Sequence, residues 1–396
     1  MLHAASPVTH GVIAVASISG RETQRHDKVA RRMHSGLLQE RNHHTQIAVW
    51  LLLCCALIFT MVVVGGVTRL THSGLSMVEW DPIMGVIPPL GQSQWEETFH
   101  KYQQFPEYVQ VNRDMTMSEF KFIYWMEYAH RLLGRGIGLA FLLPFLYFLF
   151  RRRIERSLIP KLVAMFLLGG LQGLLGWFMV KSGLIDMPRV SPYRLTAHLI
   201  LAVIIYGYIL WVALGLLFPD PENRNPSARP PRRLAHATTM LIVVMIASGG
   251  FVAGTKAGFA FITFPLMNGR LIPEGLLAMR PVWTNFFENV ATVQFDHRII
   301  AYLLCLVVPW LWYRAAKAPL HARARLASHA LLGMLVVQVS LGIATLLLVV
   351  PVALAAAHQA GAILLFTIAL FVNHELRRGR EPTLKWHTST SSRWAG

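Results

Sequence analysis

The sequence predicts an all-α fold: a polytopic membrane protein whose eight transmembrane helices form two four-helix bundles, related as a parallel repeat. Composition is the first observation behind this prediction. Of the 396 residues, 54% are hydrophobic and only 14% are charged, against about 25% charged in soluble proteins. The other two observations are eight long apolar segments and a set of motifs that recur in order. With only 3 Cys, and 29 Gly in no triplet period, disulfide-scaffold and collagen-like classes are excluded.

Each predicted span is a run of about 20 mostly apolar residues, the length that crosses a bilayer. In chain order the spans are 47–67, 131–150, 161–180, 196–218, 238–257, 296–313, 328–350 and 353–373. Pro and Gly inside these runs are compatible with the assignment, because neighbouring helices can satisfy the backbone groups that they free.

Polar segments divide the chain into two halves. Residues 1–46 are basic, rich in His and without the apolar core of a signal peptide, which predicts a disordered cytoplasmic extension. We expect the remainder to comprise an N-terminal half at 47–218, a cytoplasmic linker at 219–237, a C-terminal half at 238–373 and a cytoplasmic tail at 374–396.

The net charge of +17 predicts membrane orientation and not nucleic-acid binding. Of the 37 Lys and Arg, 24 lie in five segments that would share one side of the membrane, namely 1–46, the tail, and the loops near 151–161, 219–235 and 314–326. These segments carry +16 of the net charge. Because Lys and Arg accumulate in cytoplasmic loops, both termini are predicted to be cytoplasmic.

Four motifs recur in both halves in the same order, which indicates an internal duplication. They are Met61–Gly74 with Met245–Gly258, His130-Arg131 with His297-Arg298, Gln172 and Gly176 with Gln338 and Gly342, and His198 with His358. Each half has an even number of spans, so the two copies share one orientation and form a parallel repeat.

Four histidines lie near the starts of the even-numbered spans: His130, His198, His297 and His358. Histidine inside a membrane span is costly and indicates function. All even-numbered spans run from outside to inside, so the two imidazoles of each half should lie at similar depth on two helices. That geometry suits axial ligation of haem iron. Zinc, which takes three or four clustered ligands, and a plain interfacial role are the alternatives.

The two halves differ beside their first histidine. Glu127 lies three residues before His130 on one helix face, where the other half has Gln294. A carboxylate can move a proton or stabilise a cation, and an amide cannot. We therefore expect the N-terminal half to be catalytic and the C-terminal half to hold a structural or electron-transfer haem. Arg131 and Arg298, each next to the first histidine, are candidates for binding haem propionates.

Together these residues resemble the haem A synthase family, over roughly residues 45–375. The similarity is carried by Gly65–Met77, Trp80–Pro82, Phe120–Arg135, Phe295–Arg298 and His358-Gln359. The pattern is closer to the proteobacterial and mitochondrial branch, which has a longer first outer loop. Some members carry a cysteine pair in that loop, and this chain has none there.

The resemblance implies an oxidoreductase that converts the C8 methyl group of haem O to the formyl group of haem A, for cytochrome oxidase. It implies a haem b cofactor on His297 and His358 and a substrate haem on His130 and His198. The glutamate of the family's Glu-x-x-His-Arg motif maps to Glu127, which is the expected catalytic residue.

Candidate partners are haem O, haem O synthase, cytochrome oxidase assembly factors, membrane lipid and a second copy of the chain. The expected location is the bacterial inner membrane, with the mitochondrial inner membrane as the alternative. Two rival functions are a dihaem b-type electron-transfer protein, which leaves the difference between Glu127 and Gln294 unexplained, and a haem or small-molecule transporter.

Overall fold

A computed structural model describes residues 41–78, 87–183, 190–219 and 231–377 of the chain. The predicted N-terminal extension up to residue 40, the Trp80–Pro82 motif and the tail after residue 377 lie outside the described residues.

Eight helices are long and apolar enough to cross a membrane, which confirms the predicted number of spans. They are the first helix (Arg41–Leu70), α4 (Met117–Phe150), α5 (Ile159–Gly183), α6 (Pro192–Leu217), α7 (Arg232–Thr255), α9 (Val290–Lys317), α10 (Ala322–Leu347) and α11 (Val352–Glu375). The described residues contain no strand longer than a single bridge between Met267 and Arg270.

Several helices extend well beyond the predicted spans. α4 begins at Met117, fourteen residues before the predicted span, because Thr116 caps it: the Thr116 hydroxyl accepts from the Glu119 amide, and the Glu119 carboxylate accepts from the Thr116 amide at 2.8 Å. The first helix is already helical at Arg41, the first described residue, which lies inside the segment expected to be a disordered extension. Hydropathy marks where the bilayer is crossed, whereas caps mark where a helix ends.

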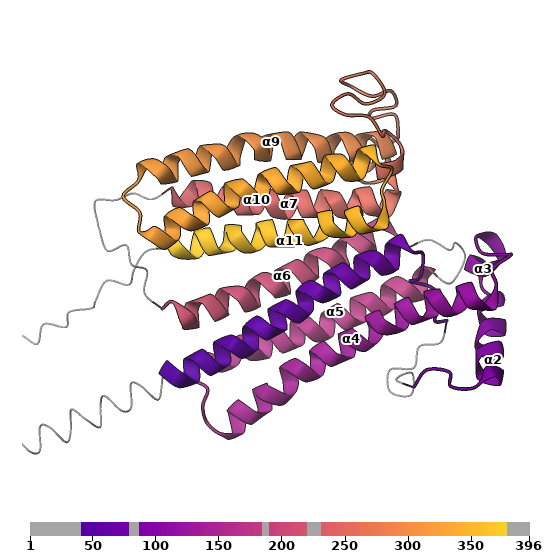
Figure 1. Cartoon of the computed structure of the whole chain (residues 1–396), viewed down its shortest axis with the longest axis horizontal. Coiled ribbons are helices and arrows are strands. Elements are labelled where there is room, and N and C mark those ends of the chain that lie inside the picture. Colours follow the sequence, from indigo (N-terminus) through magenta and orange to yellow (C-terminus); the bar gives the residue numbers. More distant parts are fainter. Residues whose placement is uncertain (1–40, 79–86, 184–189, 220–230, 378–396) are drawn as a thin grey trace, which may run out of the picture.

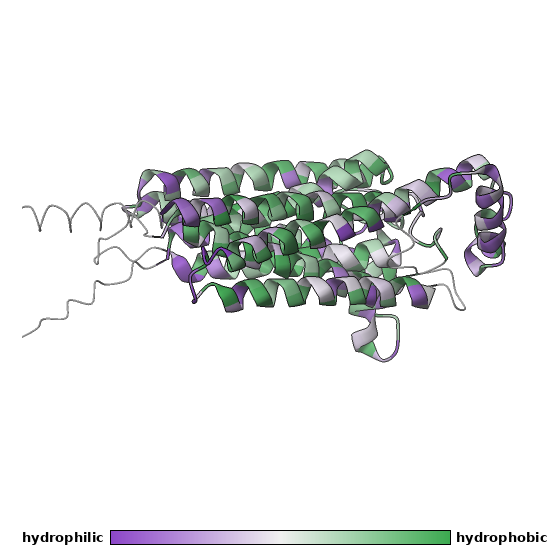
Figure 2. Ribbon diagram, turned by 90° about the horizontal axis from the view of Figure 1, so that it is seen from below, coloured by the Kyte–Doolittle hydropathy of each residue, from purple (hydrophilic) through white to green (hydrophobic). Residues whose placement is uncertain are grey.

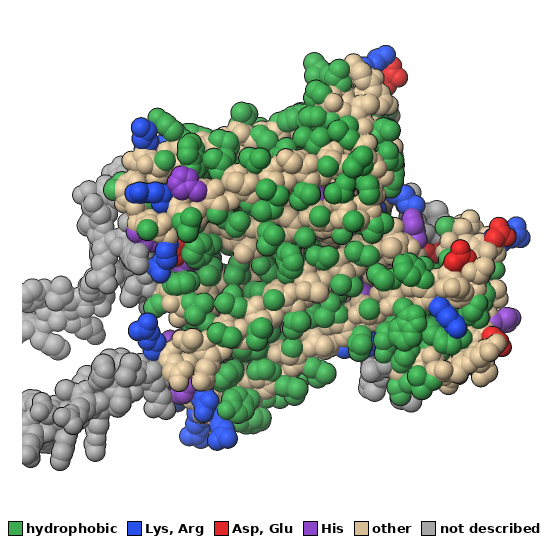
Figure 3. All heavy atoms as spheres, in the orientation of Figure 1, with side chains coloured by type: hydrophobic (Ala, Val, Ile, Leu, Met, Phe, Trp, Pro, Cys, Tyr) green, Lys and Arg blue, Asp and Glu red, His purple; other side chains and the backbone are tan. Residues whose placement is uncertain are grey.

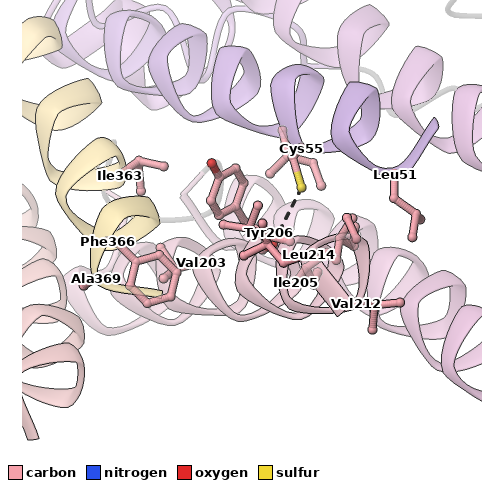
Figure 4. Packing of buried hydrophobic residues seen from close by; sticks show 14 of the residues in the cluster. Leu51, Cys55, Val203, Ile205, Tyr206, Val212, Leu214, Ile363, Phe366 and Ala369 are labelled. Carbon is pink, nitrogen blue, oxygen red and sulfur yellow. Dashed lines mark hydrogen bonds between the residues drawn. The ribbon is translucent and has the colours of Figure 1, made fainter. Parts of the chain in front are cut away.

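The helices pack as two groups side by side (Figure 1). In the C-terminal half α7, α9, α10 and α11 contact one another, and in the N-terminal half the first helix lies alongside α4, α5 and α6. α6 joins the groups through contacts with α7 and α11. At this junction the side chains of Leu51, Cys55, Tyr206 and Phe366 form a buried apolar core (Figure 4).

Shorter elements gather at one end of the bundle, opposite the end at which the first helix begins its described part and α11 finishes (Figure 1). We call it the lid end. The N-terminal half contributes α2 (Gln92–Gln103) and α3 (Pro106–Gln110). The C-terminal half contributes residues 256–289, which include η2 (Ala257–Phe259), η3 (Val282–Thr284) and α8 (Asn285–Glu288).

The two lids differ in character. α2 is largely hydrophilic (Figure 2), and its buried residues Trp95 and Tyr102 pack against Phe120 on the start of α4. Residues 256–289 project sideways from α9 (Figure 1) and expose apolar side chains, with Leu271 79% and Ile272 65% accessible. On the visible face, charged side chains lie mainly at the two ends of the molecule, and apolar ones cover the middle (Figure 3). This distribution matches a protein that crosses a membrane.

Candidate functional site

The structure brings the four histidines together as two pairs, one in each half. His130 lies on α4 and His198 on α6; His297 lies on α9 and His358 on α11. Within each pair the two rings are close enough for their charges to interact. This is the arrangement that the matched spacing predicted.

Each histidine ring faces a glycine on another helix. A methyl group placed on Gly342 would lie 2.8 Å from Cε1 of His358, and one on Gly176 would lie 3.0 Å from Cε1 of His198. The other two rings repeat this relation: a methyl group on Gly65 would lie 3.1 Å from Nε2 of His130, and one on Gly249 would lie 3.5 Å from Cε1 of His297. Glycine is therefore required at the tightest of these positions for the ring to keep its place.

Polar neighbours fix the orientation of three of the rings. Nε2 of Gln172 lies 3.3 Å from Nε2 of His198 and donates to the His198 carbonyl at 3.0 Å. Gln338 repeats the contact, 3.2 Å from Nδ1 of His358 and 2.9 Å from its carbonyl. The hydroxyl of Ser248 lies 3.1 Å from Nδ1 of His297. In the C-terminal half both Nδ1 atoms are thus held by neighbours, which leaves both Nε2 atoms for another partner.

Paired imidazoles fit a haem better than they fit zinc. Among the described residues no group of three or more His, Cys, Asp or Glu is placed to hold a metal ion. Haem needs only two axial nitrogens, with glycine at the close approaches and apolar walls. In the N-terminal half Nδ1 of His198 is buried without a hydrogen-bond partner. Because buried polar atoms normally have a partner, this ring is suited to rearrange when it binds a ligand.

Glu127 is buried at 2% accessibility and held by three groups at the lid end. Oε2 accepts from the Ser76 hydroxyl and the Met77 amide, each at 2.8 Å. Oε1 forms an ion pair with Nη2 of Arg131 at 2.6 Å, one helical turn along α4. These three donors fix the position of the Glu127 carboxyl group, about one turn from His130 on α4.

Neither arginine extends freely toward a histidine pair. Arg131 binds Glu127 and donates to the Met77 carbonyl at 2.9 Å. Arg298 donates to the Phe261 and Thr263 carbonyls, both at 3.0 Å. Arg298 therefore holds the backbone of its own lid, and Arg131 holds the backbone at Met77, in the segment that precedes the α2–α3 lid. The sequence did not predict these roles, and the expected contact with a propionate stays a prediction.

The two backbone positions that the arginines contact, Met77 and Phe261, are equivalent in the repeat. Met77 and Phe261 each lie twelve residues after the first glycine of a Gly-Gly pair, Gly65 and Gly249. In the C-terminal half Gln294 donates to the Phe261 carbonyl at 3.1 Å, where the other half uses the carboxylate of Glu127 as an acceptor from the Met77 amide. Glu127 and Gln294 therefore occupy equivalent positions in the two halves, and one is an acid where the other is an amide.

A second acidic side chain is buried above the N-terminal pair. Glu107 on α3 is 6% accessible, and its Oε2 has no hydrogen-bond partner within the described part of the chain. Burial and the nearby charge of Glu127 raise the pKa of Glu107 to about 8. Sequence inspection missed this residue, because a Glu in a polar lid resembles any solvated one.

Other contributors had a sequence signal that could have been used. The glycines that face the rings, and Gln172 and Gln338, recur at fixed offsets in both halves. Gln172 and Gln338 each contact the ring of a histidine and also donate to its carbonyl. Ser76 and Ser248 have no counterpart in the repeat, and only the folded chain places them.

A family model for a cytochrome oxidase assembly protein, COX15-CtaA, matches residues 48–370. The chain belongs to this family. The match includes all four histidines, Glu127 and both arginines, so the paired site lies wholly inside the family region.

Relatives in the family carry one name. The haem A synthase of Nitrosospira multiformis is 59% identical over 333 residues, which cover 84% of this chain and 94% of the relative. The haem A synthase of Nitrosomonas eutropha is 56% identical, over 84% and 94% of the two chains. The haem A synthase COX15 of Arabidopsis thaliana is 46% identical over 86% of this chain and 76% of its own length. Bacterial and plant members of the family are thus similar in sequence to this chain over most of its length.

Proposed function

We propose that this protein is a haem A synthase, an integral membrane oxidoreductase that converts the C8 methyl group of haem O to a formyl group. The observation that carries the proposal is the combination of two matched histidine pairs with a carboxylate beside only one of them. Membership of the family, and relatives named haem A synthase at 46–59% identity, support it independently.

Converting a methyl group to an aldehyde removes four electrons and four protons and adds one oxygen atom from water or an equivalent donor. We infer two successive hydroxylations of the methyl carbon by water, each of which releases two protons and passes two electrons to an acceptor outside this chain, followed by loss of water. Carbon that loses electrons beside an aromatic macrocycle develops positive charge, and a fixed negative charge nearby stabilises that state. The reaction therefore needs a carboxylate close to the substrate and a route for protons.

The N-terminal half supplies both requirements in this proposal. His130 and His198 hold the substrate haem by its iron, and the glycines opposite them, Gly65 and Gly176, admit the rings. Glu127, held in place by Arg131, Ser76 and the Met77 amide, stabilises positive charge at the methyl carbon or accepts its proton.

The C-terminal half holds haem b in this proposal. His297 and His358 would hold it, through the Nε2 atoms that the contacts of Ser248 and Gln338 with Nδ1 leave available. A bound haem b would supply one-electron transfer. Gln294, in the position of Glu127, is neutral, so this half lacks the charge that the chemistry needs. Arg298 closes the lid over this half.

Extraction of the bound haems tests the proposal. The full chain is expressed with a supply of haem O, and the haems are separated by chromatography. Haem A is expected from the wild type and absent from Glu127→Ala, which should still bind haem. A dihaem electron carrier, the main alternative, would return haem O unchanged. If Glu127→Ala makes normal amounts of haem A, the proposed role of the carboxylate is wrong.

Placement in the membrane is part of the proposal. The asymmetry of Lys and Arg puts both termini in the cytoplasm and the lid end outside, in the bacterial inner membrane. Protease added to sealed, right-side-out vesicles should then cleave the lids and spare the termini. Delivery of haem O by its synthase, and transfer of haem A to cytochrome oxidase assembly factors, would follow from this activity.

A further inference from the structure

Within one turn, the first helix contacts a histidine of its own half and the neighbour of a histidine in the other half. Gly65 lies against His130 of its own half. Gly66 lies against Gln359 of the other half, so closely that a methyl group on Gly66 would overlap the side-chain oxygen of Gln359. Gln359 directly follows His358 in α11. Neighbouring glycines therefore place the two haem sites on opposite sides of one short stretch of helix.

A hydrogen bond fixes this contact. Nε2 of Gln359 donates to the Val62 carbonyl at 2.8 Å. That carbonyl is also the one that pairs with the Gly66 amide inside the helix, and a carbonyl oxygen can accept two bonds. Gln359 is thus attached to the turn of helix that carries Gly65 and Gly66, and a change in its position bears directly on that turn.

The reciprocal contact lacks such a bond. In the second Gly-Gly pair, Gly250 faces Thr196 of α6, two residues before His198, and a methyl group on Gly250 would lie 2.8 Å from the Thr196 hydroxyl. That hydroxyl has no hydrogen-bond partner among the described residues. Of the two cross contacts, only the one made by Gln359 is bonded.

We propose that Gln359 is a positioning residue that couples the two haem sites: ligation of His358 in the C-terminal half orders the first helix at Gly65-Gly66 and so raises the affinity of the N-terminal pair for haem. The proposal rests on the proposed function, since it needs a haem in each half. Its physical basis is that His358 and Gln359 are adjacent on a rigid helix, so fixing the imidazole on iron fixes the neighbouring amide. By linkage, haem in the N-terminal half tightens binding in the C-terminal half by the same factor.

Haem titration of the full-length protein tests the coupling. Ferric protoporphyrin IX is added to the N-terminal site and binding is followed by absorbance, first with haem b in the C-terminal half and then in a His297→Ala background, where that half is empty. We expect the wild type to bind at least about 5-fold more tightly with the C-terminal half filled, the lower end of usual coupling factors. Gln359→Met, which keeps the length and removes the bond, should reduce this factor to about 1.

Two further variants isolate the contact. Gly66→Ala displaces the amide without altering Gln359, and it should also abolish the coupling. Thr367→Val is the matched control. Thr367 lies two turns further along α11, and its hydroxyl bonds to the Tyr206 hydroxyl of the other half at 2.8 Å. It should keep the full factor, because it breaks a contact between the halves that is remote from the histidines.

The outcomes separate the two proposals. Failure of the wild type to bind haem in either half contradicts the proposed function itself. Binding in both halves with a coupling factor of 1, or with a factor that survives both Gln359→Met and Gly66→Ala, overturns the coupling and leaves the function standing. A factor lost equally in Thr367→Val also overturns it, because the coupling would then belong to the whole interface.

Discussion

The two halves differ at one matched position, where one has a carboxyl group and the other an amide, and the proposed functional asymmetry rests on this difference. Glu127 and Gln294 have the same place, one turn before an arginine that clasps a lid, yet only Glu127 has a negative charge. The fold therefore accepts an amide at this position in one half. Because Gln294 shows that the fold accepts an amide here, Glu127→Gln is the substitution that tests the carboxyl group without disturbing the structure.

We expect Glu127→Gln to fold and to bind haem normally while haem A formation falls by about 100- to 10,000-fold, the usual contribution of a group that handles protons or charge. Haem content and haem A yield, measured on the same purified sample, check this. Glu119→Gln is the control, because Glu119 only caps α4 in an exposed turn. Activity within a few-fold of the wild type would remove Glu127 from the mechanism.

Gly342 and Gly333 both lie on α10, and they allow a test with a matched control. Gly342→Ala places a methyl group 2.8 Å from Cε1 of His358, whereas an added methyl group on Gly333 meets no atom within 4 Å. We expect Gly342→Ala to lose most of the haem b from the C-terminal half and Gly333→Ala to keep it, since alanine is otherwise the better helix former. The number of haems bound per chain, measured by absorbance, checks this prediction. Equal loss of haem in both variants would indicate a general defect of α10.

At the scale of elements, the α2–α3 lid is held over the N-terminal half by aromatic packing and contains a carboxyl group that resists ionisation. The raised pKa of Glu107 has a definite sign. Its proton is bound more tightly in the closed lid than in an opened one, where the pKa returns toward its ordinary value of 4.5. The closed lid is therefore most stable below that ordinary value and loses stability as the pH rises toward about 8.

Proteolysis of residues 87–116 should accordingly accelerate between about pH 5 and about pH 8 in the wild type, after correction for the protease's own pH dependence. Glu107→Gln should remove this rise, because an amide does not titrate. Glu97→Gln, which alters an exposed acid of α2 paired with Lys101, should behave as the wild type. A rise that persists in Glu107→Gln would assign the opening to another group.

The sequence predicted elements better than it predicted contacts. Hydropathy located all eight spans, and the repeat located all four histidines, because both depend on periodic patterns along the chain. Glu107 and Ser76 were not found, since their burial is decided by how the lids fold back onto α4. The contacts of the two arginines with backbone carbonyls distant in sequence were not predicted either, whereas their role toward a haem propionate stays a prediction. Charge and spacing identify a residue type, and only the fold selects its partner.

At the scale of the whole molecule, α6 and α7 join the two halves through a backbone contact near the lid end. Gly254 of α7 faces Pro192 of α6, and a methyl group on Gly254 would lie 2.7 Å from the Pro192 Cα. A backbone atom cannot rotate away as a side chain can, so the helices would have to separate.

We expect Gly254→Ala to lower the free energy of unfolding by about 1–3 kcal/mol, the usual cost of overpacking. It should also weaken haem binding in both halves, because α6 carries His198 and α7 carries Ser248. Thermal unfolding in detergent, with haem absorbance as a second probe, measures both effects. Gly215→Ala on α6 has open space around it and should change neither; loss of haem from one half alone would contradict the shared role of this contact.

The sideways projection of residues 256–289 affects how the protein can be handled. Leu271, Ile272 and Trp283, 79%, 65% and 59% accessible, lie outside the belt that a detergent micelle forms around the helices. In a small micelle they would meet water, and molecules would adhere through them during concentration. A lipid nanodisc has a flat bilayer that extends past the helix bundle, so it offers these side chains an apolar lipid surface. It therefore suits the binding measurements above.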